Sequence, residues 1–122
     1  MAQGQAEKNI VKSYPYEGAA VVTLAANGVL EVEEWDEDIV RLVTHIQAVN
    51  FSESTLKALA QAGRYTATSK NVDGTIILTM LKAQREVVLR GIKIEERYRF
   101  KIYVPRGTTV EQVAHQEVAS HF

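Results

Sequence analysis

Two segments of the chain alternate between apolar and polar residues strictly enough to assign the two faces of a strand. The first covers residues 40–48, where one side carries Val40, Leu42, Thr44, Ile46 and Ala48. The second covers residues 92–104 and ends at Pro105, which has no amide hydrogen to donate to a sheet. A period of two indicates strands with one buried face. Only Glu96 interrupts the apolar side of the second segment, and we expect it at a bulge or near the start of the strand.

Two glycine-containing dipeptides mark turns between further strands. Asn27-Gly28 lies in the middle of residues 20–32, and Asp73-Gly74 lies between residues 64–68 and 75–81. Both dipeptides tolerate the positive φ angles of a type I′ turn, and the flanking segments are rich in residues that favour strands. The pattern therefore predicts two β-hairpins.

One helix is predicted between the strands. Ser52 is suited to cap its N-terminus, and Gly63 is suited to end it. Phe51 before the cap and Leu56 four residues after it fit a hydrophobic staple. Leu56, Leu59 and Ala60 would then form one apolar stripe facing the core.

The segment after Gly107 fits two kinds of structure. Thr109 and Gln112 suit the start of a helix, which would carry Val110, Val113, Ala114 and Val118 on its apolar side. The Thr-Thr-Val run at its start is equally typical of a strand. We favour the helix.

The length and composition fit one ordinary globular domain. The chain has 122 residues, of which 46% are hydrophobic and 24% charged, with 2 Pro and 7 Gly. This composition excludes collagen-like and disordered chains, and no apolar run approaches the roughly 20 residues of a transmembrane helix. We expect a single, mainly β domain with one short helix, organised as an antiparallel β-sandwich or, alternatively, as the start of a β-solenoid. Residues 1–8 are expected to be a flexible lead, and residues 108–122 a helical or truncated end.

The distribution of charge bears on the expected partners and ion pairs rather than on the fold class. The net charge is −1, which argues against the non-specific polyanion binding of a strongly basic domain, so no nucleic-acid partner is expected. Residues 1–61 carry 4 basic and 9 acidic groups, whereas residues 62–122 carry 10 and 6. We expect the two halves to form opposite-charge pairs across strands or between copies.

Recognisable catalytic motifs are missing from the sequence. There is no phosphate-binding loop, dinucleotide fingerprint, zinc-protease motif or nucleophile elbow, and the absence of Cys excludes thiolate chemistry. His45, His115 and His121 form no pair at helical ligand spacing. The chain is therefore interpreted as a non-enzymatic protein without a cofactor.

An acidic run surrounds the single Trp. Six of the eight residues at positions 31–38 are Asp or Glu. A cation site built on Glu33, Asp36 and Asp38 is one interpretation, because hard cations prefer oxygen ligands. The alternative is a solvated turn that keeps a sheet edge soluble, with Trp35 as a core anchor or a cover of the turn.

A basic stripe follows the outward side of the second alternating segment. It consists of Arg97, Arg99, Lys101 and Tyr103, with Lys93 and Glu95 before them. Such a stripe suits binding to phosphate backbones or acidic glycans, although a solvated strand face has the same pattern.

Three short motifs resemble a known bacterial family. They are residues 27–36 (NGVLEVEEWD), residues 40–42 (VRL) and residues 102–107 (IYVPRG). Together they resemble the head GIN domain family of auto-transporter adhesins, a domain of unknown function common in secreted proteins of the Bacteroidetes. The resemblance covers roughly residues 19–110. Glu34 stands where the family usually has Gly, and the family continues into stacked strands of a β-solenoid beyond the point where this chain stops.

The resemblance implies an adhesin-like interaction module of the cell envelope or cell surface. It would be exported through a signal peptide absent from this sequence and act as a monomer or small homo-oligomer that binds a surface glycan or protein. The resemblance brings no catalytic residues. Two alternatives remain open, namely a chaperone sandwich similar to small heat-shock proteins and a metal-dependent enzyme using the acidic run. Large, concentration-dependent assemblies would favour the chaperone.

Overall fold

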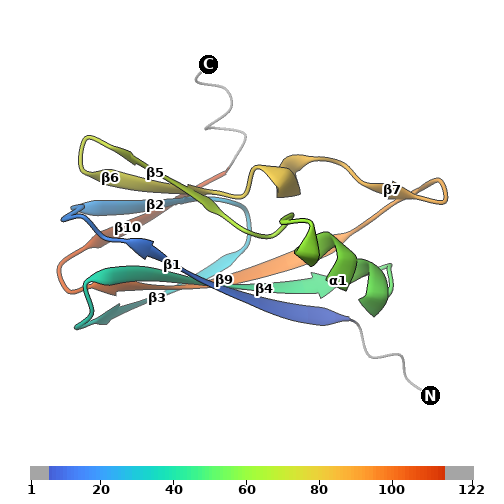
Figure 1. Ribbon diagram of the computed structural model, residues 1–122, viewed down its shortest axis with the longest axis horizontal. Coiled ribbons are helices and arrows are strands. Elements are labelled where there is room, and N and C mark those ends of the chain that lie inside the picture. Colours follow the sequence, from blue (N-terminus) through green and yellow to red (C-terminus); the bar gives the residue numbers. More distant parts are fainter. Residues whose placement is uncertain (1–5, 115–122) are drawn as a thin grey trace.

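The computed structural model describes residues 6–114, which form two four-stranded β-sheets packed face to face and a separate two-stranded sheet (Figure 1). Along the chain the elements are β1 (Glu7–Pro15), β2 (Val21–Ala25), β3 (Val29–Trp35), β4 (Ile39–Ala48), α1 (Glu53–Gln61), β5 (Thr68–Val72), β6 (Thr75–Thr79), the 3₁₀ turn η1 (Lys82–Gln84), β7 (Val88–Leu89), β8 (Ile92–Lys93), β9 (Glu96–Pro105) and β10 (Thr109–Val113). The expected fold class, a mainly β sandwich-like domain with one α-helix, is confirmed.

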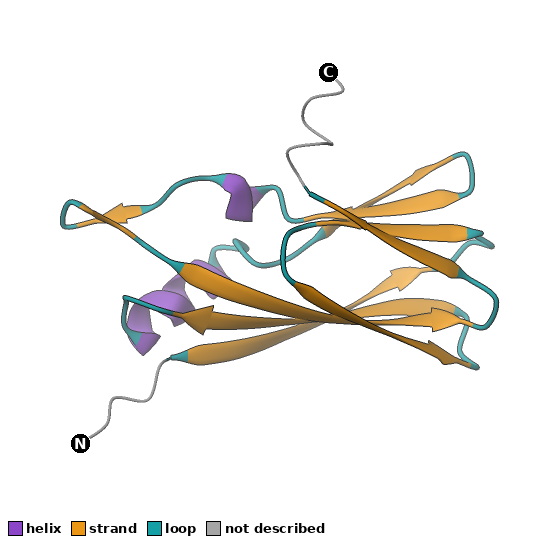
Figure 2. Ribbon diagram, turned by 180° about the vertical axis from the view of Figure 1, so that it is seen from behind, coloured by secondary structure: helices purple, strands orange, loops and turns teal. Residues whose placement is uncertain are grey.

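The two layers of the sandwich are mixed sheets rather than purely antiparallel ones. Sheet A has the order β1-β4-β9-β3, and sheet B has the order β10-β2-β6-β5. β3 runs parallel to β9, and β2 runs parallel to both β6 and β10. The view from behind shows the strands of the two layers above and below a shared interior (Figure 2). Parallel neighbours require connections that leave the sheet, so each sheet is assembled from distant parts of the chain.

The core lies between the layers. Its largest fully buried side chains come from both sheets and from the helix, and they include Leu24, Leu42, Ile46, Leu56, Tyr65, Ile76, Leu78 and Ile102. β4 follows the predicted alternation, with Val40, Leu42, Thr44, Ile46 and Ala48 buried and the residues between them partly exposed. The period of two in the sequence therefore identified the correct buried face of this strand.

The predicted helix is confirmed as α1. The Ser52 side chain accepts a hydrogen bond from the Thr55 backbone amide at 3.2 Å, which caps the helix. Leu56 is fully buried, and Phe51 packs partly buried against the same core. Gly63 follows the end of the helix with φ +85°, a left-handed conformation that favours glycine.

One of the two predicted hairpins forms, with a shifted first strand. β5 and β6 pair antiparallel across Asp73-Gly74, whose φ angles of 49° and 81° fit a type I′ turn. Residues 64–67, expected in the first strand, instead lead into β5, which begins at Thr68.

The prediction of a hairpin at Asn27-Gly28 is wrong. β2 belongs to sheet B and β3 to sheet A, so this dipeptide carries the chain from one layer to the other. A Cβ atom on Gly28, which has φ +147°, would lie 2.6 Å from the Tyr98 backbone oxygen. Glycine is therefore required here by the close approach of β9 as well as by the turn itself.

The helix favoured after Gly107 is also wrong for the residues that the structure describes. Thr109–Val113 form β10, which pairs in parallel with β2 at the edge of sheet B. Val110 packs against the core, and Gln112 Nε2 donates to the backbone oxygens of Ala26 and Gly28 at 3.0 and 2.8 Å. Pairing with a distant strand outweighs the weak helical pattern. Residues 115–122 of the expected helical end lie outside the described residues.

Two further boundaries differ from expectation. β1 begins at Glu7, so the last two residues of the expected flexible lead belong to a strand. Residues 92–104 do not form one strand, because Ile92–Lys93 pair with β7 in a separate hairpin and β9 begins at Glu96. Among residues 6–114, no helix combines the length and the apolar character needed to cross a bilayer.

Candidate functional site

The first residues of β9 line a hollow of about 720 Å³. β3 pairs with β9 only from Arg99 onward, so residues 96–98 have no neighbouring strand on that side. The turn between β2 and β3 forms one wall of the hollow, and Met80 together with Ala83 of η1 forms another. The hollow thus opens beside residues 96–98 because β3 does not extend far enough to pair with them.

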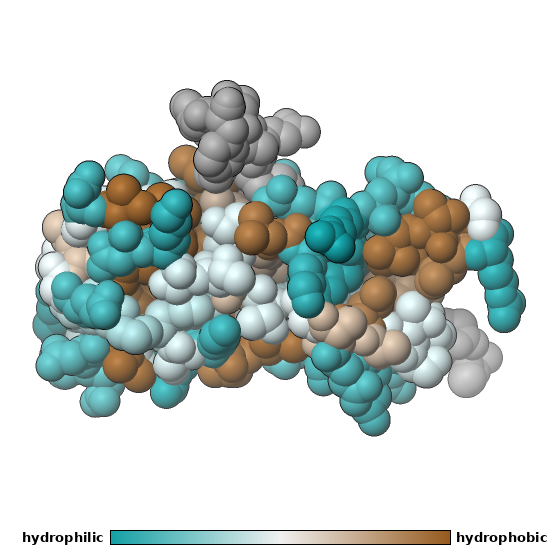
Figure 3. All heavy atoms as spheres, turned by 45° about the horizontal axis from the view of Figure 1, so that its top comes forward, coloured by the Kyte–Doolittle hydropathy of each residue, from teal (hydrophilic) through white to brown (hydrophobic). Residues whose placement is uncertain are grey.

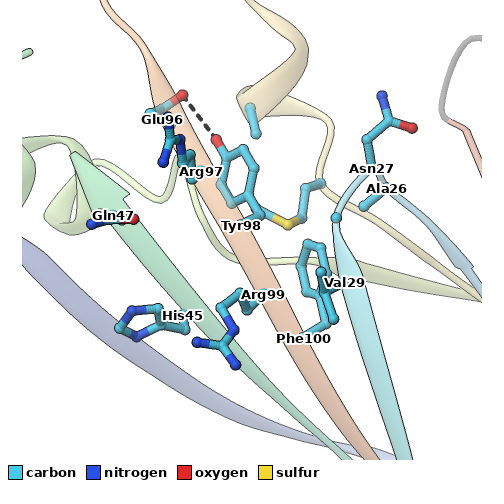
Figure 4. A pocket seen from close by; sticks show the side chains of 13 residues that line it. Ala26, Asn27, Val29, His45, Gln47, Glu96, Arg97, Tyr98, Arg99 and Phe100 are labelled. Atoms are coloured by element: carbon cyan, nitrogen blue, oxygen red, sulfur yellow. Dashed lines mark hydrogen bonds between the residues drawn. The ribbon is translucent and has the colours of Figure 1, made fainter. Parts of the chain in front are cut away.

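Alternation along β9 gives the hollow an apolar side and a cationic side. Figure 4 shows Phe100 and Val29 on one side of β9, with Arg99 and His45 on the other. Arg97 and Arg99 are both exposed, whereas Phe100 is 3% exposed. Arginine at the rim and aromatic carbon inside suit a ligand that carries both negative charge and apolar surface.

Arg97 and Arg99 make no side-chain hydrogen bond or ion pair within the part of the chain that the structure describes. In contrast, both ring nitrogens of the neighbouring His45 contact side chains of β1. Its Nδ1 lies 2.7 Å from Asn9 Oδ1, and its Nε2 lies 2.7 Å from Glu7 Oε1. The two guanidinium groups are thus the cations of this face that remain available to an outside anion.

Glu96 forms the buried end of the hollow and is fully hydrogen-bonded. Arg64 donates to it from Nε at 2.9 Å and from Nη2 at 2.8 Å. The hydroxyl of Tyr65 donates to Oε2, and that of Tyr98 donates to Oε1 at 2.9 Å. The Glu96 and Arg64 side chains are only 7% and 8% exposed. The residue that interrupts the apolar pattern therefore begins β9, as expected, and forms a buried ion pair.

The pKa values of this cluster follow from burial and hydrogen bonding. Burial alone would raise the pKa of Glu96, but the hydrogen bonds from Arg64, Tyr65 and Tyr98 hold it below its ordinary value. Burial, together with the neighbouring carboxylate, raises the pKa of both tyrosines far above the usual range. Glu96 is therefore ionised and the tyrosines neutral at neutral pH, so we assign the cluster a structural rather than a proton-transfer role.

Arg64 also fixes the segment that leads to the β7–β8 hairpin. Its Nη1 donates to the backbone oxygens of Lys82 and Arg85 at 3.0 and 2.8 Å. One buried side chain thus satisfies carbonyl groups of the 3₁₀ turn and joins that turn to the first residue of β9.

Lys101 and Tyr103, at the C-terminal end of the basic stripe, have side-chain partners. Lys101 forms an ion pair with Glu33 at 3.2 Å and lies 5.1 Å from the centre of the Tyr103 ring. The hydrogen bond to Glu33 raises the pKa of Lys101. Tyr103 also contacts Trp35, with ring centres 5.0 Å apart. The structure thus brings the four predicted stripe residues onto one face and leaves Arg97 and Arg99 as its unpaired cations among the described residues.

Trp35 covers the turn between β3 and β4. Its Nε1 donates to the Ile39 backbone oxygen at 3.0 Å, and the Arg41 guanidinium lies 5.0 Å from its ring centre. The interpretation of Trp35 as a cover of this turn agrees with these contacts.

The acidic residues considered for a cation site engage separate partners. Glu33 binds Lys101, and Asp36 accepts a 2.6 Å hydrogen bond from Arg106 Nε. Asp38 is exposed in the turn after β3. Over residues 6–114, the structure holds no group of three or more His, Asp or Glu side chains arranged to bind a metal ion. Both ion pairs join the acidic first half of the chain to the basic second half.

The Arg64–Glu96 pair was not predicted from the sequence. Arg64 stood in an expected strand, and nothing in the local pattern linked it to a residue 32 positions away. The only available signal was Glu96 itself, because a carboxylate on an apolar strand face requires a buried donor.

Comparison with family models, curated proteins and solved structures returned no match for this chain.

Proposed function

We propose that this protein is a non-enzymatic, adhesin-like binding module of the cell envelope or cell surface, and that it recognises an acidic glycan along β9. The proposal rests on Arg97, Arg99, Lys101 and Tyr103, which share the outer face of sheet A. The observation that carries it is the pair of exposed arginines with no ion-pair partner in the described part of the chain.

The spacing of the stripe suits an extended ligand. Alternate residues of a strand are roughly 6.6 Å apart, so the stripe extends over roughly 20 Å. Uronate or sulfate groups of a linear glycan can accept paired hydrogen bonds from Arg97 and Arg99. The Tyr103 ring, held against Trp35, offers an aromatic surface to the apolar face of a sugar ring.

The acidic residues make the two ends of the stripe differ in charge. Glu33 neutralises Lys101, and further carboxylates lie in β3 and in the turn after it. We therefore place the anionic groups of the glycan at Arg97 and Arg99, and the less charged part of the ligand at Tyr103.

The binding test uses polygalacturonate and heparin as acidic probes and dextran as the neutral one. We expect salt-sensitive binding to the acidic polymers and an affinity at least about tenfold lower for the Arg97→Glu/Arg99→Glu variant. The control is Lys57→Glu/Lys70→Glu, which makes the same charge change on α1 and β5, outside the stripe on β9. Equal losses in both variants, or equal binding to dextran, would contradict the proposal.

The proposed location is tested separately on the native protein in its source cell. We expect protease treatment of intact cells to remove it, as for a protein exposed at the surface. Recovery of the protein in the cytosolic fraction would overturn the envelope assignment without bearing on glycan affinity.

A further inference from the structure

A hairpin that stands away from the sandwich exposes three large apolar side chains. β7 and β8 pair only with each other, and Figure 1 shows β7 at the far right, beyond the strands of both sheets. Val88 is 53% exposed, Leu89 37% and Ile92 63%. In Figure 3 a hydrophobic area at this end of the molecule is bounded by hydrophilic atoms at the tip. Apolar surface of this kind marks a contact site.

The apolar side chains occupy both faces of the hairpin. Leu89 and Ile92 are cross-strand partners and share one face, whereas Val88 pairs with Lys93 on the other. A protein partner docked on one face would leave the other in water, but a lipid interface surrounds the whole tip. We propose that the β7–β8 hairpin inserts its tip into the surface of an anionic lipid bilayer.

The charges around the tip are complementary to anionic lipid. Arg85, Arg90 and Lys93 are accompanied by two carboxylates, Glu86, which lies 3.3 Å from Lys93 Nζ, and Glu95 at the base of the hairpin, so the basic groups are in excess. Arg90 occupies the turn itself with φ 53°, a conformation for which Asn, Asp and Gly are the favoured residues. Asp73 stands at the corresponding place in the β5–β6 turn. Arg90 enters with its neighbours at the tip, and its long side chain can bend back to lipid phosphate groups while Leu89 and Ile92 contact the apolar layer.

The dimensions and the rigidity of the hairpin fit insertion. The two strand residues of β7 and the first turn residue, 88–90, extend at most about 10 Å, which matches the roughly 5–10 Å by which interfacial elements enter a bilayer. The base is tied to the body by Asn50, which donates to the Lys93 oxygen and accepts from the Glu95 amide at 3.0 and 2.8 Å. Arg64 fixes the other side through the Arg85 oxygen. The tip is therefore held out from the body before it meets a membrane.

The proposal is tested by co-sedimentation of the full chain with vesicles. We expect binding to vesicles of phosphatidylcholine with about one third phosphatidylglycerol and much weaker binding to phosphatidylcholine alone. The variant Val88→Ser/Leu89→Ser/Ile92→Ser should partition at least about tenfold less, as should Arg85→Gln/Arg90→Gln. The matched control is Val11→Ser/Val72→Ser, which changes exposed valines of β1 and β5 and should bind as the wild type does. Circular dichroism and thermal unfolding check that each variant folds.

A site-specific label separates insertion from other causes of binding. The chain has no Cys, so Leu89→Cys and Val11→Cys each carry one environment-sensitive fluorophore. We expect a blue shift with anionic vesicles for the label at position 89 and none at position 11. Unchanged emission at position 89 would overturn the proposal, as would vesicle binding that is lost in Arg97→Glu/Arg99→Glu but kept in the triple serine variant. A hairpin-dependent dimer without vesicle binding would overturn it in favour of a second copy as the partner.

Discussion

At the scale of single residues, Glu96 connects the sequence pattern to the organisation of the site. It is the one polar side chain on the apolar side of residues 92–104, and the structure pairs it with Arg64. A buried carboxylate is tolerable only with charged and hydrogen-bonding partners, and here Arg64, Tyr65 and Tyr98 supply them. Arg64 also binds the backbone oxygen of Arg85, between η1 and the β7–β8 hairpin. One ion pair therefore supports both the hollow and this hairpin.

Replacing Arg64 should therefore destabilise the folded protein. We expect Arg64→Met to lower the free energy of unfolding by about 3–5 kcal/mol, because it leaves the buried Glu96 carboxylate without its cation. The control is Arg106→Met, which removes an exposed ion pair and should leave the urea midpoint nearly unchanged. Urea unfolding measures both variants. Equal costs for the two substitutions would show that burial gives the Arg64 pair no special role.

The contribution of this pair should also depend on pH. The folded protein holds the pKa of Glu96 below its value of about 4.5 in the unfolded chain, so the ionised carboxylate stabilises the fold above about pH 4.5. This stabilisation is lost as the pH falls through the folded-state pKa. The stability difference between the wild type and Arg64→Met should therefore shrink at acidic pH, and a constant difference in urea unfolding across pH would contradict the assignment.

At the scale of elements, two similar dipeptides have different outcomes. Asp73-Gly74 closes a hairpin with both residues in the left-handed region, as its local chemistry predicts. At Asn27-Gly28 only the glycine has a positive φ angle, and the chain passes to the other sheet. Local turn propensity is the same at both sites. The difference arises because β3 pairs with β9 and β2 pairs with β6, leaving no hairpin between them.

This contrast predicts unequal effects of alanine at the two glycines. Gly74→Ala should cost about 1–2 kcal/mol, the strain of a left-handed alanine in open space. Gly28→Ala should cost more, because its Cβ would lie 2.6 Å from the Tyr98 oxygen and displace β9. Thermal or urea unfolding of the two variants tests the order, and a smaller cost for Gly28→Ala would contradict the close approach.

At the scale of the whole molecule, each sheet joins segments that are remote in sequence. β2 is flanked by β6 and β10, and β9 lies between β3 and β4. The helix favoured for residues after Gly107 was wrong because the local pattern there is ambiguous and the unpaired edge of β2 accepts a strand. Long-range parallel pairing of this kind is invisible to a period measured along the chain.

Removing β10 should therefore destabilise the entire sandwich. A chain ending at residue 108 loses five register pairs with β2, the packing of Val110 and both hydrogen bonds from Gln112. We expect its free energy of unfolding to be at least about 3 kcal/mol lower than that of a control chain ending at residue 114, which keeps the strand. Equal urea midpoints for the two shortened chains would show that β10 is dispensable.

The sequence by itself determined the mainly β class, the buried face of β4, the capped helix, the Asp73-Gly74 turn and the common face of the basic stripe. These features depend on alternation, capping and turn chemistry, which act over a few neighbouring residues. Only the tertiary structure decided the mixed strand order, the crossing at Gly28, the strand β10, the partner of Glu96 and the projecting hairpin. Those features depend on which distant segments bury one another, because the free energy of packing and pairing outweighs local preference.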